Sequence, residues 1–242
     1  MENVIEIQGL KKSFGGHEVL KNITLNVEKG KSIVVLGKSG QGKSVMIKCV
    51  VGMMIPDEGS LKVFGNEVAE MNEDELREMR TKIGFLFQGG ALYDSMTVRE
   101  NLAFALTRVL KIKDDADIEK RAVEALDAVG LGEAIDKMPS DLSGGMRKRM
   151  AFARTLIVKP EIILYDEPTT GLDTITSKEI SRLMLDIQKK YKTSSIIITH
   201  DMQCAKITAD RIVVLNEGEL IAEGTYSELE NCDNDFVQQF FK

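Results

Sequence analysis

A glycine-rich segment, residues 37–44, has the spacing of a phosphate-binding loop. Glycines let backbone N–H groups turn toward phosphate oxygens without a Cβ in the way. We expect the loop to bind a nucleoside triphosphate, with Lys43 on the β- and γ-phosphates and Ser44 on a Mg²⁺ ion. The binding residues expected are Gly37, Lys38, Ser39, Gly40, Gln41, Gly42, Lys43 and Ser44.

Two adjacent carboxylates follow an apolar run, residues 162–165, that predicts a buried strand. Ligands of open α/β sheets bind at the carboxyl ends of such strands. Asp166 is therefore expected to hold Mg²⁺, directly or through water, and Glu167 to activate the attacking water as a general base. An acidic turn after a strand is common, so this interpretation depends on the upstream glycine-rich loop.

A second glycine pair lies at a predicted helix start, in the sequence Leu-Ser-Gly-Gly-Met. Its Ser143, Gly144 and Gly145 could form another anion-binding site. One chain would then carry two phosphate-binding surfaces. If they lie too far apart to share one nucleotide, a head-to-tail dimer with two-fold symmetry places each ATP between the loop of one copy and the glycine pair of the other.

Short apolar runs alternate with helical periodicity along the chain, which is typical of an α/β fold. Helix-like spacing dominates residues 88–158, so we expect a core of residues 1–87 and 159–242 interrupted by a helical lobe. Strands are expected at residues 4–7, 23–27, 32–36, 83–87, 162–165 and 196–199, with a hairpin at 211–215 and 219–223. Helices are expected at residues 43–51, 72–80, 98–110, 117–129 and 144–157, with a capping box at Thr225 and Glu228 opening a terminal helix.

Composition argues against several classes of protein. The chain has 242 residues and a net charge of −6, which does not favour nucleic acid as the main partner. Cys49, Cys204 and Cys232 form no CxxC pair, so we expect reduced thiols and a cytosolic protein. No signal peptide and no apolar stretch of the ~18 residues needed to span a bilayer is evident, so any membrane role would be peripheral.

The three motifs together resemble the ATP-binding-cassette (ABC) ATPases over residues 4–229. The resemblance implies a P-loop NTPase core with a mixed sheet, an N-terminal antiparallel β subdomain and an inserted α-helical subdomain. It also implies roles for four further residues. Gln88 would sense Mg–ATP and contact the metal, Asp173 would contact the second subunit, His200 would contact the γ-phosphate, and Phe14 would lie against adenine.

A narrower resemblance involves the segment between Gln88 and Asn101, which is similar to the Q-loop region of Mla-type ATPases. That subfamily powers phospholipid or hydrophobic-substrate trafficking across the bacterial envelope. The resemblance implies three partners: a second copy of this chain, a permease contacted along this segment and an envelope lipid-binding protein. It implies that this chain lies on the cytoplasmic face of the inner membrane. Thr174 replaces the proline usual after Asp173, which bears on loop rigidity.

Alternative functions remain open. The chain could be the ATPase of another ABC importer or exporter, a soluble ABC ATPase acting on ribosomes or DNA, or a non-catalytic nucleotide-binding module. Glu167 and His200 argue against the last of these. The basic run, residues 147–149, is expected to be a solvated or acid-paired helix face. The tail after Asp233 could pack on its own core or bind a partner.

Overall fold

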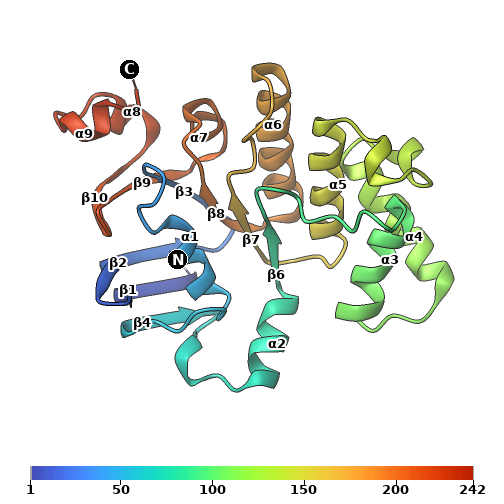
Figure 1. Ribbon diagram of the computed structural model, residues 1–242, viewed down its shortest axis with the longest axis horizontal. Coiled ribbons are helices and arrows are strands. Elements are labelled where there is room, and N and C mark those ends of the chain that lie inside the picture. Colours follow the sequence, from blue (N-terminus) through green and yellow to red (C-terminus); the bar gives the residue numbers. More distant parts are fainter. Residues whose placement is uncertain (1, 242) are drawn as a thin grey trace.

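An antiparallel sheet forms the N-terminal part of the computed structural model, which describes residues 2–241 (Figure 1). Its strand order is β2-β1-β4-β5. The two long strands pair as a hairpin whose turn lies between Phe14 and His17. The bounds are β1 Asn3–Phe14, β2 His17–Glu28, β4 Glu58–Val63 and β5 Asn66–Glu67. The predicted strands at residues 4–7 and 23–27 are therefore parts of longer ones.

A second sheet has the order β10-β9-β3-β8-β7-β6. Neighbours from β9 to β6 run parallel, and β10 is antiparallel to β9, so the sheet is mixed as expected. The bounds are β3 Ser32–Leu36, β6 Ile83–Leu86, β7 Ile162–Asp166, β8 Ser194–Ile198, β9 Arg211–Asn216 and β10 Glu219–Gly224.

The register of the parallel strands aligns their carboxyl ends. Val35 pairs with Ile198, Ile198 with Asp166, and Leu86 with Tyr165. The glycine-rich loop, Gln88, Glu167 and His200 all follow these strand ends within two residues. One edge of the sheet therefore collects residues that lie far apart in the sequence.

Both faces of this sheet are buried. Ile33 and Val35 belong to a cluster with the antiparallel sheet and α1, whereas Val34 and Leu36 belong to a cluster with α5, α6 and α7. This alternation explains why the strands read as continuous apolar runs. The helices span α1 Lys43–Val50, α5 Gly144–Leu156, α6 Thr174–Tyr191 and α7 Met202–Thr208.

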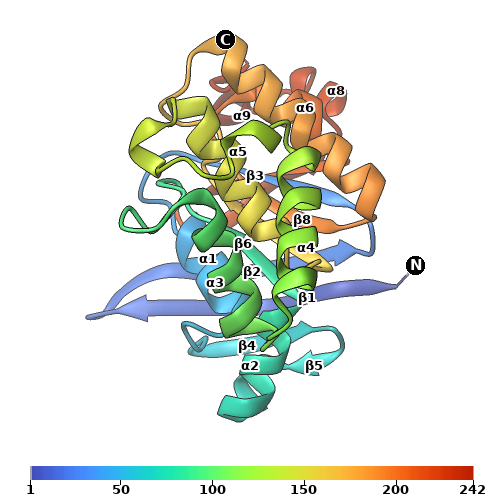
Figure 2. The ribbon, with the colours of Figure 1, turned by 90° about the vertical axis from the view of Figure 1, so that its right-hand side faces the viewer.

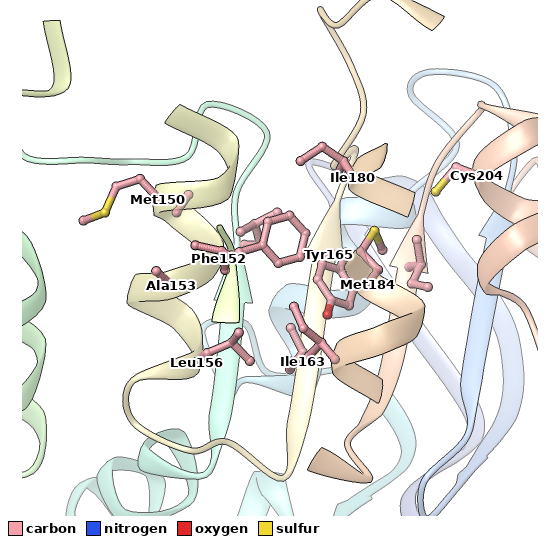
Figure 3. Close-up of a cluster of buried hydrophobic side chains, with 14 of the residues drawn as sticks. Met150, Phe152, Ala153, Leu156, Ile163, Tyr165, Ile180, Met184 and Cys204 are labelled. Atoms are coloured by element: carbon pink, nitrogen blue, oxygen red, sulfur yellow. The ribbon is translucent and has the colours of Figure 1, made fainter. Parts of the chain in front are cut away.

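The insert between β6 and β7 is helical, as predicted, and faces the viewer in Figure 2. Besides α5 it contains α3 Val98–Val109, α4 Asp115–Ala128 and the 3-10 turns η2 Gly132–Ala134 and η3 Pro139–Asp141. Helix α5 packs on the sheet through Phe152, whose ring lies 5.6 Å from that of Tyr165, and Figure 3 shows Ile180 and Met184 of α6 on the other side of Tyr165. The insert is thus anchored to the strand that ends in the paired carboxylates.

The remaining helices include α2 Glu73–Thr81, capped by Asn72, and the 3-10 turn η1 Val68–Glu70. At the C-terminal end, α8 Tyr226–Glu230 begins with the predicted capping box, and α9 Asp235–Gln238 follows it. Val237 is fully buried, so the tail packs on its own core. The three cysteines are free thiols, as expected. Within residues 2–241, no helix combines the length and apolar character needed to cross a membrane.

Candidate functional site

The glycine-rich loop connects the buried strand β3 to helix α1. Gly42 has a φ of 93°, and a Cβ there would lie 2.8 Å from both the Val19 carbonyl oxygen and Leu20 Cδ2. A Cβ on Gly37 would lie 2.6 Å from the Leu215 carbonyl oxygen. Within the described residues, no side chain caps the N-terminus of α1. Its first N–H groups therefore remain available for phosphate oxygens.

Lys43 lies folded against this loop. Its Nζ donates to the carbonyl oxygens of Gly37 at 2.6 Å and Lys38 at 2.9 Å. The side chain is buried, and this burial lowers the pKa of the ammonium, while the charges of Glu167 and Asp166 oppose that shift. The cation is therefore held in place at the position where phosphate charge would arrive.

Ser44 and Asp166 converge from α1 and the end of β7. The Ser44 hydroxyl donates to the Asp166 carboxylate, with oxygen–oxygen distances of 3.2 and 3.3 Å. Burial raises the pKa of Asp166, against the lowering effects of the Ser44 hydrogen bond and Lys43. A hydroxyl and a carboxylate oxygen at this spacing are the hard donors that Mg²⁺ prefers, so the two residues fit the expected metal site.

Glu167 is held at the same sheet edge by three contacts. Its φ is 52°, and its backbone N–H donates to the Ile198 carbonyl. Its carboxylate lies 2.8 Å from His200 Nδ1 and accepts a hydrogen bond from the Thr170 hydroxyl at 3.2 Å. The side chain is only 15% exposed. A fixed, sheltered carboxylate beside an imidazole is suited to orienting and deprotonating a water molecule.

These residues share one cavity of about 610 Å³. The lining includes the whole glycine-rich loop, Gln88, Asp166, Glu167 and His200. Thr170 and Val19 also line it, and neither was predicted from the sequence. Phe14 is not among the described residues that line the cavity; it lies half exposed at the tip of the β1–β2 hairpin, with Lys12 Nζ 5.5 Å from its ring centre. Its proposed contact with adenine stays a prediction.

The second glycine pair lies elsewhere. Ser143 caps α5 by accepting a hydrogen bond from the Met146 N–H at 3.3 Å, and residues 143–145 are not among the described residues lining the cavity. A Cβ on Gly145 would lie 2.8 Å from Thr176 Cγ2, so this motif adjoins the start of α6. One chain therefore presents the glycine-rich loop and the second glycine pair as separate surfaces.

Asp173 caps α6 next to that motif. Its carboxylate accepts hydrogen bonds from the backbone of Ile175 and Thr176 at 3.0 Å and from the Thr176 hydroxyl at 2.6 Å. These hydrogen bonds lower the pKa of Asp173, and the one from the Thr176 hydroxyl has the largest effect. Thr174 begins the helix, so the absence of proline leaves the turn defined by capping.

The prediction for the basic run was wrong at one residue. Arg149 is acid-paired, with Glu179 at 2.9 Å. Lys148, in contrast, is buried and donates to the Gln88 carbonyl. The sequence holds a signal for this burial: Ala151 and Phe152, three and four residues on, place the same helix face in the core.

Comparison with known proteins identifies the family. A sequence model described as ABC transporter matches residues 20–170. The chain belongs to the ABC transporter family. It is 39% identical to the probable ribonucleotide transport ATP-binding protein mkl of Mycobacterium leprae, over 98% of this chain and 68% of that protein. It is 36% identical to the chloroplastic TRIGALACTOSYLDIACYLGLYCEROL 3 protein of Arabidopsis thaliana, over 98% of this chain and 73% of that protein. The chain thus spans about two thirds to three quarters of these relatives.

Solved structures agree with this assignment. A dimeric post-hydrolysis state of an ATP-binding cassette, bound to ADP and Pi, has a TM-score of 0.82 at 32% identity, over 92% of this chain and 98% of that one. The structure of cbiO1 from Clostridium perfringens, part of the ABC transporter complex cbiONQ, has a TM-score of 0.88 at 27% identity. The match covers 100% of this chain and 93% of that one. The ABC ATPase fold and an ATP-hydrolysing activity follow for this chain.

Proposed function

We propose that this ATPase works as a pair of identical subunits that closes around two Mg–ATP molecules. The observation that carries the proposal is the separation of the two phosphate-binding surfaces in one chain. The cavity holds the glycine-rich loop, Asp166 and Glu167, but its described lining lacks Ser143, Gly144 and Gly145. A second copy supplies these residues, with Asp173 next to them at the subunit contact. The dimeric cassette structures support this arrangement.

Each group in the cavity then has a chemical role. Phosphoryl transfer depends mostly on positioning and on stabilising charge. Lys43 and the N-terminus of α1 hold the β- and γ-phosphates. Ser44, Asp166 and Gln88 would hold Mg²⁺, which would neutralise phosphate charge. Glu167 accepts a proton from the attacking water. His200, 2.8 Å from Glu167, holds that carboxylate in place and contacts the γ-phosphate.

We further propose that the segment from Gln88 to Asn101 contacts a membrane permease. Tyr93 is 42% exposed in this segment, and its ring lies 4.8 Å from that of Phe104. Asn101 is fully buried and holds the segment in shape, because its amide donates to the carbonyls of Tyr93, Met96 and Thr97 and accepts from the Tyr93 N–H. An exposed aromatic surface on a fixed loop next to Gln88 suits a partner that must sense the nucleotide.

Phospholipid or another hydrophobic molecule is the proposed substrate. This chain works at the cytoplasmic face of the inner membrane, and an envelope lipid-binding protein belongs to the full complex. The Mla-like sequence from Gln88 to Asn101 supports this, as does the 36% identity to a relative named for a galactolipid. The same identity is found to the methionine import ATP-binding protein MetN of Clostridioides difficile. The transport assay must therefore separate these two substrates.

Two experiments test the proposal. Affinity purification from detergent-solubilised membranes should recover an integral membrane protein, and Tyr93→Asp should abolish this without lowering ATP hydrolysis by the isolated dimer. The matched control is Val109→Asp, an exposed apolar position on α3 outside the segment. The purified complex in vesicles should then move labelled phospholipid with ATP. Movement of methionine instead of lipid would contradict the substrate, and recovery unchanged by Tyr93→Asp would contradict the contact surface.

A further inference from the structure

Helix α5 joins two parts of the machinery that act on different nucleotides. Its N-terminus carries the Ser143–Gly145 motif, which completes the site of the second subunit. Its side packs along residues 88–91, which follow β6 and begin with Gln88, a residue that lines the cavity of its own subunit. Three contacts define this packing, at successive positions of one helix face: Lys148, Ala151 and Arg154.

Those contacts hold the backbone of the segment that carries Gln88. Lys148 Nζ donates to the Gln88 carbonyl. A Cβ on Gly90 would lie 3.3 Å from Ala151 Cβ. Arg154 donates to the carbonyls of Gly90 at 3.1 Å and Ala91 at 2.6 Å. The segment therefore cannot move relative to α5 without breaking charge-assisted hydrogen bonds.

Lys148 is an unusual member of this set because its charge is sheltered. The side chain is only 8% exposed, and no carboxylate among the described residues lies within ion-pair distance of it. Burial lowers the pKa of its ammonium, and the charge of Glu167 opposes that shift. A buried cation whose hydrogen bond goes to one backbone carbonyl is costly to keep, which argues for a role besides stability.

The position of Lys148 also separates it from direct chemistry. It is not among the described residues that line the cavity, whereas Gln88 is. In the described chain, the Gln88 carbonyl accepts its hydrogen bond from Lys148. Lys148 therefore does not contact the nucleotide itself. Besides its charge interaction with Glu167, it acts on the site by fixing the backbone from which the Gln88 side chain enters it.

We propose that Lys148 is a positioning residue that couples the two ATP sites of the dimer, by tying the Ser143–Gly145 motif of one site to Gln88 of the other. When ATP in the partner's site draws the N-terminus of α5 toward it, the helix moves as a unit and Lys148 carries Gln88 with it. Coupling of this kind is reciprocal, so a shift of Gln88 in its own site also changes how the motif meets the partner's ATP. The inference rests on the paired-subunit function proposed above.

The test measures ATP hydrolysis as a function of ATP concentration in the full-length protein. Lys148→Met keeps the length of the side chain and removes the donor, while Lys148→Arg keeps a cationic donor. Lys120→Met is the control, because Lys120 is an exposed lysine on α4 of the same insert. Nucleotide affinity is measured separately on dilute protein, where the loop of residues 37–44 binds ATP without the partner.

The proposal predicts that Lys148→Met lowers kcat about tenfold, the worth of one hydrogen bond to a charged group, and brings the Hill coefficient toward 1. Binding by dilute protein stays unchanged, Lys148→Arg recovers most of both parameters, and Lys120→Met matches the wild type. A wild-type Hill coefficient above 1 that Lys148→Met leaves unchanged overturns this inference alone. A wild-type coefficient of 1 contradicts the paired-site function and this inference together.

Discussion

Replacing Glu167 by glutamine removes the proposed general base while keeping its shape. The carboxylate accepts a hydrogen bond from Thr170 and lies 2.8 Å from His200 Nδ1. An amide oxygen at the same position can accept from both neighbours. We therefore expect the free energy of unfolding of Glu167→Gln to change by less than about 1 kcal/mol.

The effect on turnover should be far larger. A positioned general base contributes about 10²–10⁴-fold to a reaction rate, so kcat should fall within that range. Lys43, Ser44 and Asp166 are untouched, so ATP binding should persist. Because the two subunits are proposed to close around ATP, and slow hydrolysis leaves that ATP in place, a closed dimer with bound ATP should accumulate.

The assay combines phosphate release with light scattering after gel filtration in Mg–ATP. Glu179→Gln is the control, because that carboxylate pairs with Arg149 and lies outside the described lining of the cavity. It should leave kcat near that of the wild type. If Glu167→Gln retained full activity, the role of this residue as general base would be refuted.

Two further changes test the loop and the stability of the core. Gly42→Ala should weaken ATP binding about 5- to 150-fold in an equilibrium titration, because the left-handed φ and the contact with Val19 together cost about 1–3 kcal/mol. Gly65→Ala, also at positive φ but with nothing within 4 Å, should bind ATP normally, and equal losses in both variants would contradict the argument. Burial raises the pKa of Asp210, yet hydrogen bonds from the Ser32 N–H, Lys31 and Gln188 outweigh it and hold the pKa below its usual range. A lowered pKa stabilises the fold above the unfolded-state value and loses this stabilisation as pH falls through the folded-state value. In urea unfolding, Asp210→Asn should lose about 1 kcal/mol at pH 7 and less at acidic pH, and an equal loss at both would count against these contacts.

The sequence predicts much of the fold because its local patterns agree with the tertiary structure. The buried strand β3 Ser32–Leu36 has the predicted bounds, and α5 Gly144–Leu156 ends within one residue of the prediction. The elements that were not predicted include β4 Glu58–Val63, α6 Thr174–Tyr191 and α7 Met202–Thr208. Helix α6 does carry a signal, since Ile180, Met184 and Ile187 recur at helical spacing and are all buried. Strand β4 exists through long-range pairing with β1, which no local pattern specifies.

The residues of the candidate site also differ in how far local sequence patterns predict them. The loop, Asp166 and Glu167 could be predicted because contiguous motifs place them at strand ends. Gln88 and His200 needed the family resemblance, because a single glutamine or histidine after a strand carries no chemistry by itself. The proposed role of Lys148 could not be predicted from the sequence, because it depends on which backbone carbonyl the folded chain places beside this lysine. That contact joins residues 60 positions apart.

The central claim is that each ATP site combines residues of two copies, and mixing two inactive variants tests it most directly. Lys43→Ala removes the phosphate-binding cation, and Gly144→Asp adds a negative charge to the second motif, where a Cβ meets only Leu172 Cδ2 at 3.8 Å. Each variant alone should hydrolyse almost no ATP. Random mixing puts one intact site in half of the dimers, so an equal mixture should recover up to roughly a quarter of wild-type activity. A mixture no more active than its two components would contradict the account.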